Sequence, residues 1–106
     1  MRKHVDIPFL AIFKEPMLAG SKTCTARTRK YGKPGDRFEA WGQTFEISEV
    51  IRVFLSTVRD QFYQFEGFTS PDDFVATWNK LHPIRGFDPE AAVYVHSFRK
   101  LEGVKR

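Results

Sequence analysis

The stretch LAGSKTCTAR, residues 18–27, decides how this chain folds. Gly20 is the residue type that ends a short helix with a positive φ angle. The threonines that follow it favour an extended backbone, so we expect a strand that runs to Arg27. Side chains alternate along a strand, which puts Thr25 and Arg27 on one face and Cys24 on the other. The polar residues therefore gather at a corner between a helix and a strand.

Lys22, Thr25 and Arg27 form a combination that catalysis can use. A hydroxyl beside an amine and a guanidinium matches a nucleophile, its base and a holder for an anion. The same residue types are also ordinary solvent-facing residues of a turn after a helix. Their spacing alone leaves both interpretations open.

The segment from Gly20 to Arg27 resembles the G-x-K-T-x-T-x-R signature of the ASCH domain, a small PUA-like barrel family. Gly35-Asp36 and then Glu66-Gly67-Phe68 follow in the order that this family uses, and an aromatic helix with Trp78 comes after them. The resemblance runs from about Leu10 to Leu101 and implies one ASCH-like domain over residues 1–106. With the strand and helix patterns, it predicts an α+β fold: a small open β-barrel of about five or six strands with about three short helices.

The family resemblance also implies a cleft for a nucleobase or RNA and, as in some bacterial members, hydrolysis of the N4-acyl amide of acetylated cytidine. The residues that match those hydrolases are Lys22, Thr25 and Glu66. Thr25 would attack the acyl carbon, Lys22 would take its proton, and Glu66 would hold the amino group of the base and guide a proton to it. Arg27 would bind a ligand phosphate or pair with a carboxylate inside the protein. Each residue also has a simpler role: a phosphate contact for Lys22, a strand position for Thr25 and a surface or ion-paired carboxylate for Glu66.

Three aromatic side chains, Trp41, Tyr63 and Phe68, are candidates for stacking on a base, because aromatic faces bind any base. Phe68 directly follows Glu66-Gly67, and Trp41 is expected near the tip of a hairpin. Aromatic residues at strand and helix spacing are more often part of a core, and Phe74 and Trp78 are assigned to the core.

The composition bounds the class of protein. The chain has 106 residues, 42% hydrophobic and 28% charged, which suits one globular domain. No apolar run approaches the roughly twenty residues of a membrane helix, and the first residues do not match a signal peptide, so we expect a cytoplasmic protein. A single cysteine, Cys24, and three scattered histidines predict no disulfide, no metal site and no cofactor. We expect a monomer.

The charge is mildly basic, with 17 basic and 13 acidic residues. Five basic side chains fall between Arg27 and Arg37, opposed only by Asp36. Such a cluster suits a nucleotide phosphate or an RNA backbone, although most charge runs are solvated surface. A noncatalytic RNA-binding module is therefore the alternative function.

The rest of the chain predicts the other elements. Ile7–Phe13 could begin as a strand, and the run Arg37–Trp41 alternates as a half-buried strand that turns back at Gly42-Gln43. The following strand slips phase after Glu49, which indicates a bulge or bend. Apolar spacing predicts a helix from a Ser56 or Thr57 cap to Glu66-Gly67, a second helix that begins with Ser70-Pro71, and a last strand over 91–98.

Overall fold

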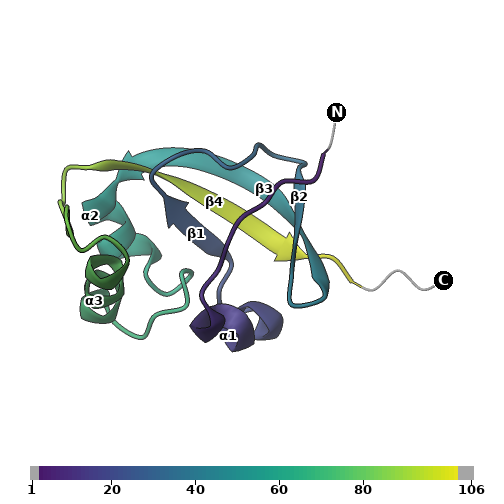
Figure 1. Cartoon of the computed structure of the whole chain (residues 1–106), viewed down its shortest axis with the longest axis horizontal. Helices are drawn as coiled ribbons and strands as arrows, with labels where there is room; N and C mark the ends of the chain where they lie inside the picture. Colours follow the sequence, from purple (N-terminus) through teal and green to yellow (C-terminus); the bar gives the residue numbers. More distant parts are fainter. Residues whose placement is uncertain (1–2, 103–106) are drawn as a thin grey trace.

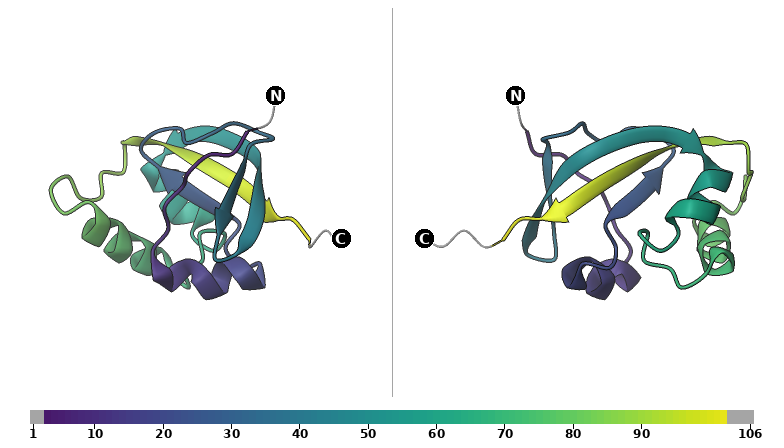
Figure 2. Two further views of the ribbon diagram at one scale, coloured as in Figure 1. Left: turned by 45° about the vertical axis from the view of Figure 1, so that its right-hand side comes forward. Right: turned by 180° about the vertical axis from the view of Figure 1, so that it is seen from behind.

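A curled antiparallel sheet forms the centre of the molecule in the computed structural model, which describes residues 3–102 (Figure 1). The strand order is β1-β4-β3-β2. The two long central strands, β3 and β4, carry most of the curvature (Figure 2). The strands are β1 (Cys24–Arg27), β2 (Arg37–Ala40), β3 (Gln43–Phe54) and β4 (Ala92–Lys100).

The α+β class and the open half-barrel are confirmed, but the described residues form four strands and not five or six. The strand expected over Ile7–Phe13 is wrong. Next to this segment there is only an isolated parallel bridge between His4 and Arg37, and a 3-10 turn, η1, occupies Ala11–Phe13. Pro8 has no N–H to donate to a ladder, so this segment crosses the molecule as extended chain without pairing.

The β2–β3 hairpin turns one residue earlier than expected. Trp41 and Gly42 both have positive φ angles, 52° and 77°, as the two central residues of a type I′ hairpin turn require. The predicted bulge is confirmed: the register between β3 and β4 shifts between Ile47 and Glu49, which leaves Ser48 without a partner. This extra residue bends β3 and helps the sheet to curl.

The helical segments lie on the concave side of the sheet, with α1 at one end and α2 and α3 at the other (Figure 2). Gly20 ends the first helix in the left-handed region, as predicted. Ser70 caps the longest helix, where its side chain accepts a hydrogen bond from the Asp73 backbone N–H, also as predicted. The segments are α1 (Lys14–Ala19), α2 (Leu55–Thr57), the π-helical η2 (Val58–Phe62) and α3 (Pro71–Leu81).

The second helical segment differs from the expectation at its start. It begins at Leu55 after an extended Phe54, without a side-chain cap, because β3 leads directly into it. The chain then continues through η2 to the turn that contains Glu66. Among the helices described, α3 with 11 residues is the longest, and none is long and apolar enough to cross a membrane.

Two apolar clusters pack against the sheet, and they lie on opposite faces of β4, because Val93 and Val95 belong to the first and Phe98 to the second. The first packs β1 and β4 against α2, η2 and α3, and it includes Cys24, Leu55, Phe74 and Trp78. The second packs the hairpin and β4 against α1 and the N-terminal segment, and it includes Phe13, Met17, Phe38 and Phe45. Phe68 contacts both clusters, so the Glu66–Phe68 turn lies where they meet.

Candidate functional site

A pocket of about 330 Å³ opens between the N-terminal segment, β1, the turn after η2 and one face of α3. Its volume is in the range of small-molecule sites. Aromatic rings supply much of its wall, and a few buried polar groups converge within it, which is the usual composition of a ligand pocket. The aromatic lining residues are Phe9, Phe13, Tyr31, Phe68, Phe74 and Trp78, and the polar ones include Lys22, Thr25, Arg27, Glu66, Thr77 and His82.

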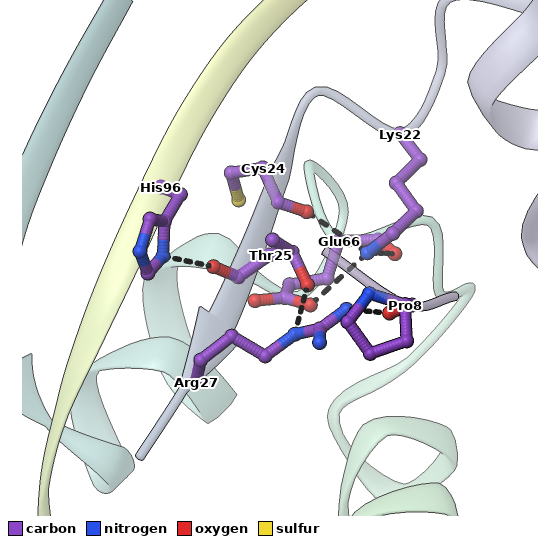
Figure 3. Close-up of polar contacts among 7 residues, drawn as sticks. All are labelled: Pro8, Lys22, Cys24, Thr25, Arg27, Glu66 and His96. Carbon is purple, nitrogen blue, oxygen red and sulfur yellow. Dashed lines mark hydrogen bonds and ion pairs between the residues drawn. The ribbon is translucent and has the colours of Figure 1, made fainter. Parts of the chain in front are cut away.

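Lys22 is almost completely buried, with 1% of its surface exposed. Its Nζ donates to the backbone oxygens of Cys24 and Glu66, both at 2.9 Å, and to Glu66 Oε1 at 3.3 Å (Figure 3). Three acceptors match the three protons of an ammonium group. Nζ also lies 4.4 Å from the centre of the Phe13 ring, which favours the same charged form. Lys22 is therefore an ammonium group held in one position.

Two glycines allow this arrangement. Gly20 turns the chain sharply out of α1, and the backbone N–H groups of Ser21 and Lys22 both donate to the Pro16 carbonyl. Gly67 has a φ angle of 95°, and a Cβ atom there would lie 3.2 Å from Lys22 Cβ. Gly67 thus combines the left-handed backbone with a close approach to the lysine, and any other residue would push Glu66 away from Lys22.

Glu66 brings a buried carboxylate to the pocket. Its Oε1 pairs with Lys22, whereas Oε2 is buried and has no hydrogen-bond partner among the described residues. Burial raises the pKa of Glu66, and that rise is opposed only in part by the charge and hydrogen bond of Lys22, by the Ala26 backbone N–H and by the Arg27 charge. A buried carboxylate oxygen without a partner is costly, so a donor group on a ligand would satisfy it.

Thr25 and Arg27 alternate along β1 and meet on the pocket side. Arg27 Nε donates to Thr25 Oγ1 at 3.0 Å, so the hydroxyl proton of Thr25 is directed elsewhere. A second Arg27 nitrogen donates to the Pro8 carbonyl at 2.6 Å, and the guanidinium lies over the Phe9 ring at 4.9 Å. Burial lowers the pKa of Arg27, whereas Tyr31 acts to raise it. Arg27 therefore fastens the N-terminal segment to β1 and forms one wall of the pocket.

Cys24 lies on the opposite face of β1, in the first apolar cluster, as the alternation predicts. Burial raises the pKa of its thiol, so the thiol stays protonated and packs as a small apolar group.

Of the predicted site residues, the structure brings five into one pocket: Lys22, Thr25, Arg27, Glu66 and Phe68. The Phe68 ring packs edge-on against both Phe13 and Phe74, with centroids 5.7 Å apart in each case. No observation tests the roles that the sequence suggested for these side chains, and their catalytic and binding functions stay predictions.

The structure does not bring Trp41 into this pocket with the other five residues, and its role in binding a base stays a prediction. Trp41 occupies the type I′ turn of the β2–β3 hairpin, and its ring packs on Phe9 at a centroid distance of 6.1 Å. The turn directs its ring toward the second apolar cluster.

Several lining residues were missed or assigned only to the core. Trp78 and Phe74 are buried in the core as predicted, but they also form the pocket floor. His82 caps the C-terminal end of α3 and stacks on Trp78, with ring centroids 4.1 Å apart. The i, i+4 spacing of the two residues in the sequence indicates that their side chains are neighbours. Tyr31 reaches the pocket from the loop after β1, a placement that no local pattern indicates.

The residues described contain no group of three or more His, Cys, Asp or Glu side chains placed to hold a metal ion.

Solved structures with the same architecture define the class of fold. The chain is similar to an ASCH domain from Lactobacillus crispatus JV V101, with 14% identity, coverage of 93% of this chain and 79% of that one, and a TM-score of 0.62. It is similar to the hypothetical protein PH0355, with 16% identity, coverage of 95% and 100%, and a TM-score of 0.67. Protein PF0455 from Pyrococcus furiosus gives 12% identity, coverage of 96% and 97%, and a TM-score of 0.61.

These likenesses establish the fold: the chain has the fold of the solved ASCH domain, as its sequence predicts. No model of a known protein family matches the sequence. No curated protein matches it significantly.

Proposed function

We propose that the pocket binds an N4-acylated cytosine nucleoside and hydrolyses its amide. The observation that carries this proposal is the buried Lys22–Glu66 pair, whose free carboxylate oxygen lines the same pocket as the Thr25 hydroxyl. A carboxylate is the acceptor that suits the exocyclic N–H of cytosine. Phe68 and Trp78 supply aromatic surface in this pocket against which a base can lie.

The chemistry begins with the ion pair. Lys22 cannot act as a base while it is an ammonium group, and its contact with Glu66 Oε1 at 3.3 Å gives one route to neutrality. Transfer of one proton from Lys22 to Glu66 leaves an amine and a carboxylic acid, and burial favours this neutral pair. The raised pKa of Glu66 acts in the same direction.

The Thr25 hydroxyl proton and the proton on Glu66 are each transferred to a defined acceptor. As Thr25 Oγ1 bonds to the acyl carbon, its proton passes to the neutral Lys22 amine. The amide C–N bond breaks, and the proton on Glu66 passes to the departing N4 nitrogen, which releases cytidine. An acyl-threonine ester remains, and the charged Lys22–Glu66 pair is restored. Water then cleaves the ester, which returns the Thr25 hydroxyl and releases the carboxylic acid.

Arg27 has a supporting role in this scheme. Its Nε–H, already 3.0 Å from Thr25 Oγ1, stabilises negative charge that develops on that oxygen and holds the hydroxyl in place. Because Arg27 makes these hydrogen bonds within the protein, we favour a role in positioning Thr25 over a role in binding a ligand phosphate.

The test is turnover of N4-acetylcytidine by purified protein, followed through the absorbance difference between acylated and free base. We expect cytidine to form without added metal. Thr25→Val and Lys22→Met should each lower kcat by about 10²- to 10⁴-fold, since each removes a reacting group. Binding of the nucleoside without turnover in the wild type would refute the hydrolase.

RNA binding is a second candidate, favoured by the loop after β1. Arg29 and Lys30 are exposed, and the Arg29 guanidinium lies 4.0 Å from the centre of the Tyr31 ring at the pocket. If this loop contacts an RNA backbone, affinity for single-stranded RNA should fall steeply with salt. Replacing Arg29, Lys30 and Lys33 by alanine should flatten that dependence, and binding that does not respond to salt would exclude this role.

A further inference from the structure

His96 is a fully buried side chain on β4, directly opposite Thr25 of β1. Its Nδ1 lies 3.3 Å from the Thr25 carbonyl oxygen (Figure 3). Its Nε2 accepts a hydrogen bond from the Tyr31 backbone N–H at 3.0 Å. A backbone N–H can only donate and a carbonyl can only accept. The ring is therefore the neutral tautomer that carries its proton on Nδ1.

This imidazole joins two separate walls of the pocket. Thr25 belongs to β1, whereas Tyr31 belongs to the loop between β1 and β2, and both line the cavity. The Tyr31 ring also packs edge-on against His96, with centroids 6.1 Å apart. One side chain thus fixes the strand and the loop relative to one another.

We propose that His96 is a positioning residue that assembles this pocket only as a neutral imidazole. A proton taken from solvent onto Nε2 converts that atom from an acceptor to a donor. Two N–H groups then face each other, so the hydrogen bond to Tyr31 is lost and the Tyr31 loop detaches from the strand that carries Thr25. The consequence for catalysis rests on the proposed function, but the joining of strand and loop does not.

The surroundings of His96 oppose its protonation. Arg27 faces it from β1, Lys30 and Tyr31 from the loop, and β3 places only the apolar Val50 opposite it. Burial lowers the pKa of His96 most, and the two positive charges lower it further against hydrogen bonds that raise it. His96 therefore stays neutral at neutral pH. The hydrogen bond that connects the Tyr31 loop to the strand is lost only as the pH falls below the ordinary pKa range of histidine.

The test uses nuclear magnetic resonance on the full-length protein without ligand, so it stands apart from any failure of the hydrolase assay. Imidazole nitrogen shifts should identify His96 as the Nδ1–H tautomer. As the pH is lowered, the Tyr31 amide should lose its hydrogen-exchange protection with the same midpoint as the His96 titration. The His96→Gln variant keeps an acceptor but does not titrate, so its Tyr31 amide should stay protected across that range.

Control variants distinguish the titration of His96 from that of the other two histidines. His4 is exposed, so His4→Gln should leave the pH-dependent loss of protection at the Tyr31 amide unchanged. The proposal would be overturned if this loss of protection disappeared in His82→Gln and persisted in His96→Gln. An Nε2–H tautomer would overturn it, as would a Tyr31 amide that ignores the His96 titration or a His96 that stays neutral wherever the chain is folded. Global unfolding at the same midpoint would also overturn it. If His96→Gln does not fold, the wild-type titration alone decides.

Discussion

The two ends of the sheet each carry an ion-pair cluster, and the two clusters differ in solvent exposure. At the hairpin end, Glu46 pairs with Arg37 at 3.5 Å and with Arg99 at 2.6 Å, and the Arg99 side chain is 65% exposed. At the β1 end, Lys22 and Glu66 pair at 3.3 Å with side chains only 1% and 5% exposed.

The two carboxylates also differ in their pKa shifts. Desolvation acts to raise the pKa of Glu46, but hydrogen bonds and charges from Arg99 and Arg37 outweigh it, so the pKa of Glu46 is lowered. For Glu66, desolvation dominates and the pKa is raised. The hairpin cluster therefore lowers the pKa of its carboxylate, whereas the pKa of the carboxylate in the pocket pair is raised and its Oε2 has no hydrogen-bond partner among the described residues. A sequence count of opposite charges would not distinguish them.

Removing one partner from each ion-pair cluster should give the largest difference between the two ends, measured as a loss in the free energy of unfolding. Lys22→Met leaves the Glu66 carboxylate buried and unpaired, and loss of one partner of a buried pair costs about 3–5 kcal/mol in the free energy of unfolding. Arg99→Met removes a largely exposed partner and should leave that free energy nearly unchanged. Urea denaturation of the two variants measures both values. Equal losses would contradict the distinction between the two ends.

Gly67→Ala should have the next largest effect. The substitution adds a Cβ 3.2 Å from Lys22 Cβ at a φ angle of 95°, so we expect a loss of about 1–3 kcal/mol and a weaker Lys22–Glu66 contact. Gly35→Ala is the matched control, because Gly35 has a φ angle of 96° but an added Cβ there meets nothing within 4 Å. Thermal unfolding should show the greater loss for Gly67→Ala, and identical losses would mean that the contact with Lys22 is not tight.

The pH dependence of kcat should show the next largest difference between the carboxylates at the two ends of the sheet. In the proposed mechanism the neutral Lys22–Glu66 pair forms by proton transfer from a resting state with a charged Lys22 and an ionised Glu66. A Glu66 that is already protonated cannot accept that proton, so kcat should fall as the pH drops through the pKa of Glu66, by about tenfold per pH unit below it. Because that pKa is raised, the fall should begin above the ordinary range of a glutamic acid. A pH–rate profile of the wild type checks this. Glu46→Gln should leave the acid limb in place, and an acid limb at the ordinary pKa of Glu would show that Glu66 is not the titrating group.

Aromatic substitutions should give the smallest contrast. Phe68→Leu removes a pocket ring that touches Phe13 and Phe74, and it should weaken cytidine binding by about 1 kcal/mol. Trp41→Leu alters the hairpin turn outside the pocket and should leave the affinity unchanged. Calorimetric titration with cytidine compares the two variants, and a greater loss for Trp41→Leu would identify Trp41 as a ligand contact.

The sequence predicted the features that depend on local chemistry. Gly20 ends α1 with a positive φ, Ser70 caps α3, and alternation places Cys24 in the core and Thr25 at the pocket. In each case the deciding interaction lies within a few residues along the chain. The family resemblance placed Glu66 in the same site as Lys22 although 44 residues separate them, but it did not predict that the two side chains pair directly.

Features that depend on distant contacts were not predicted. The N-terminal segment looked like a strand, but Arg27 holds it as extended chain through the Pro8 carbonyl. The sequence grouped Trp41 with the other site residues, but the geometry of its turn directs its ring to Phe9. The role of His96 depends on Thr25 and Tyr31, which lie 71 and 65 residues away, so no local pattern carried it.

One measurement tests most directly whether the pocket is the ligand site. Cytidine is titrated into the full-length protein labelled with nitrogen-15, and the backbone amide signals are followed. We expect shifts that saturate together at Thr25, Gly67 and Phe68, with the signals of Glu46 and Arg99 unchanged. Shifts centred on Glu46 and Arg99, or no shifts at any cytidine concentration, would contradict this expectation.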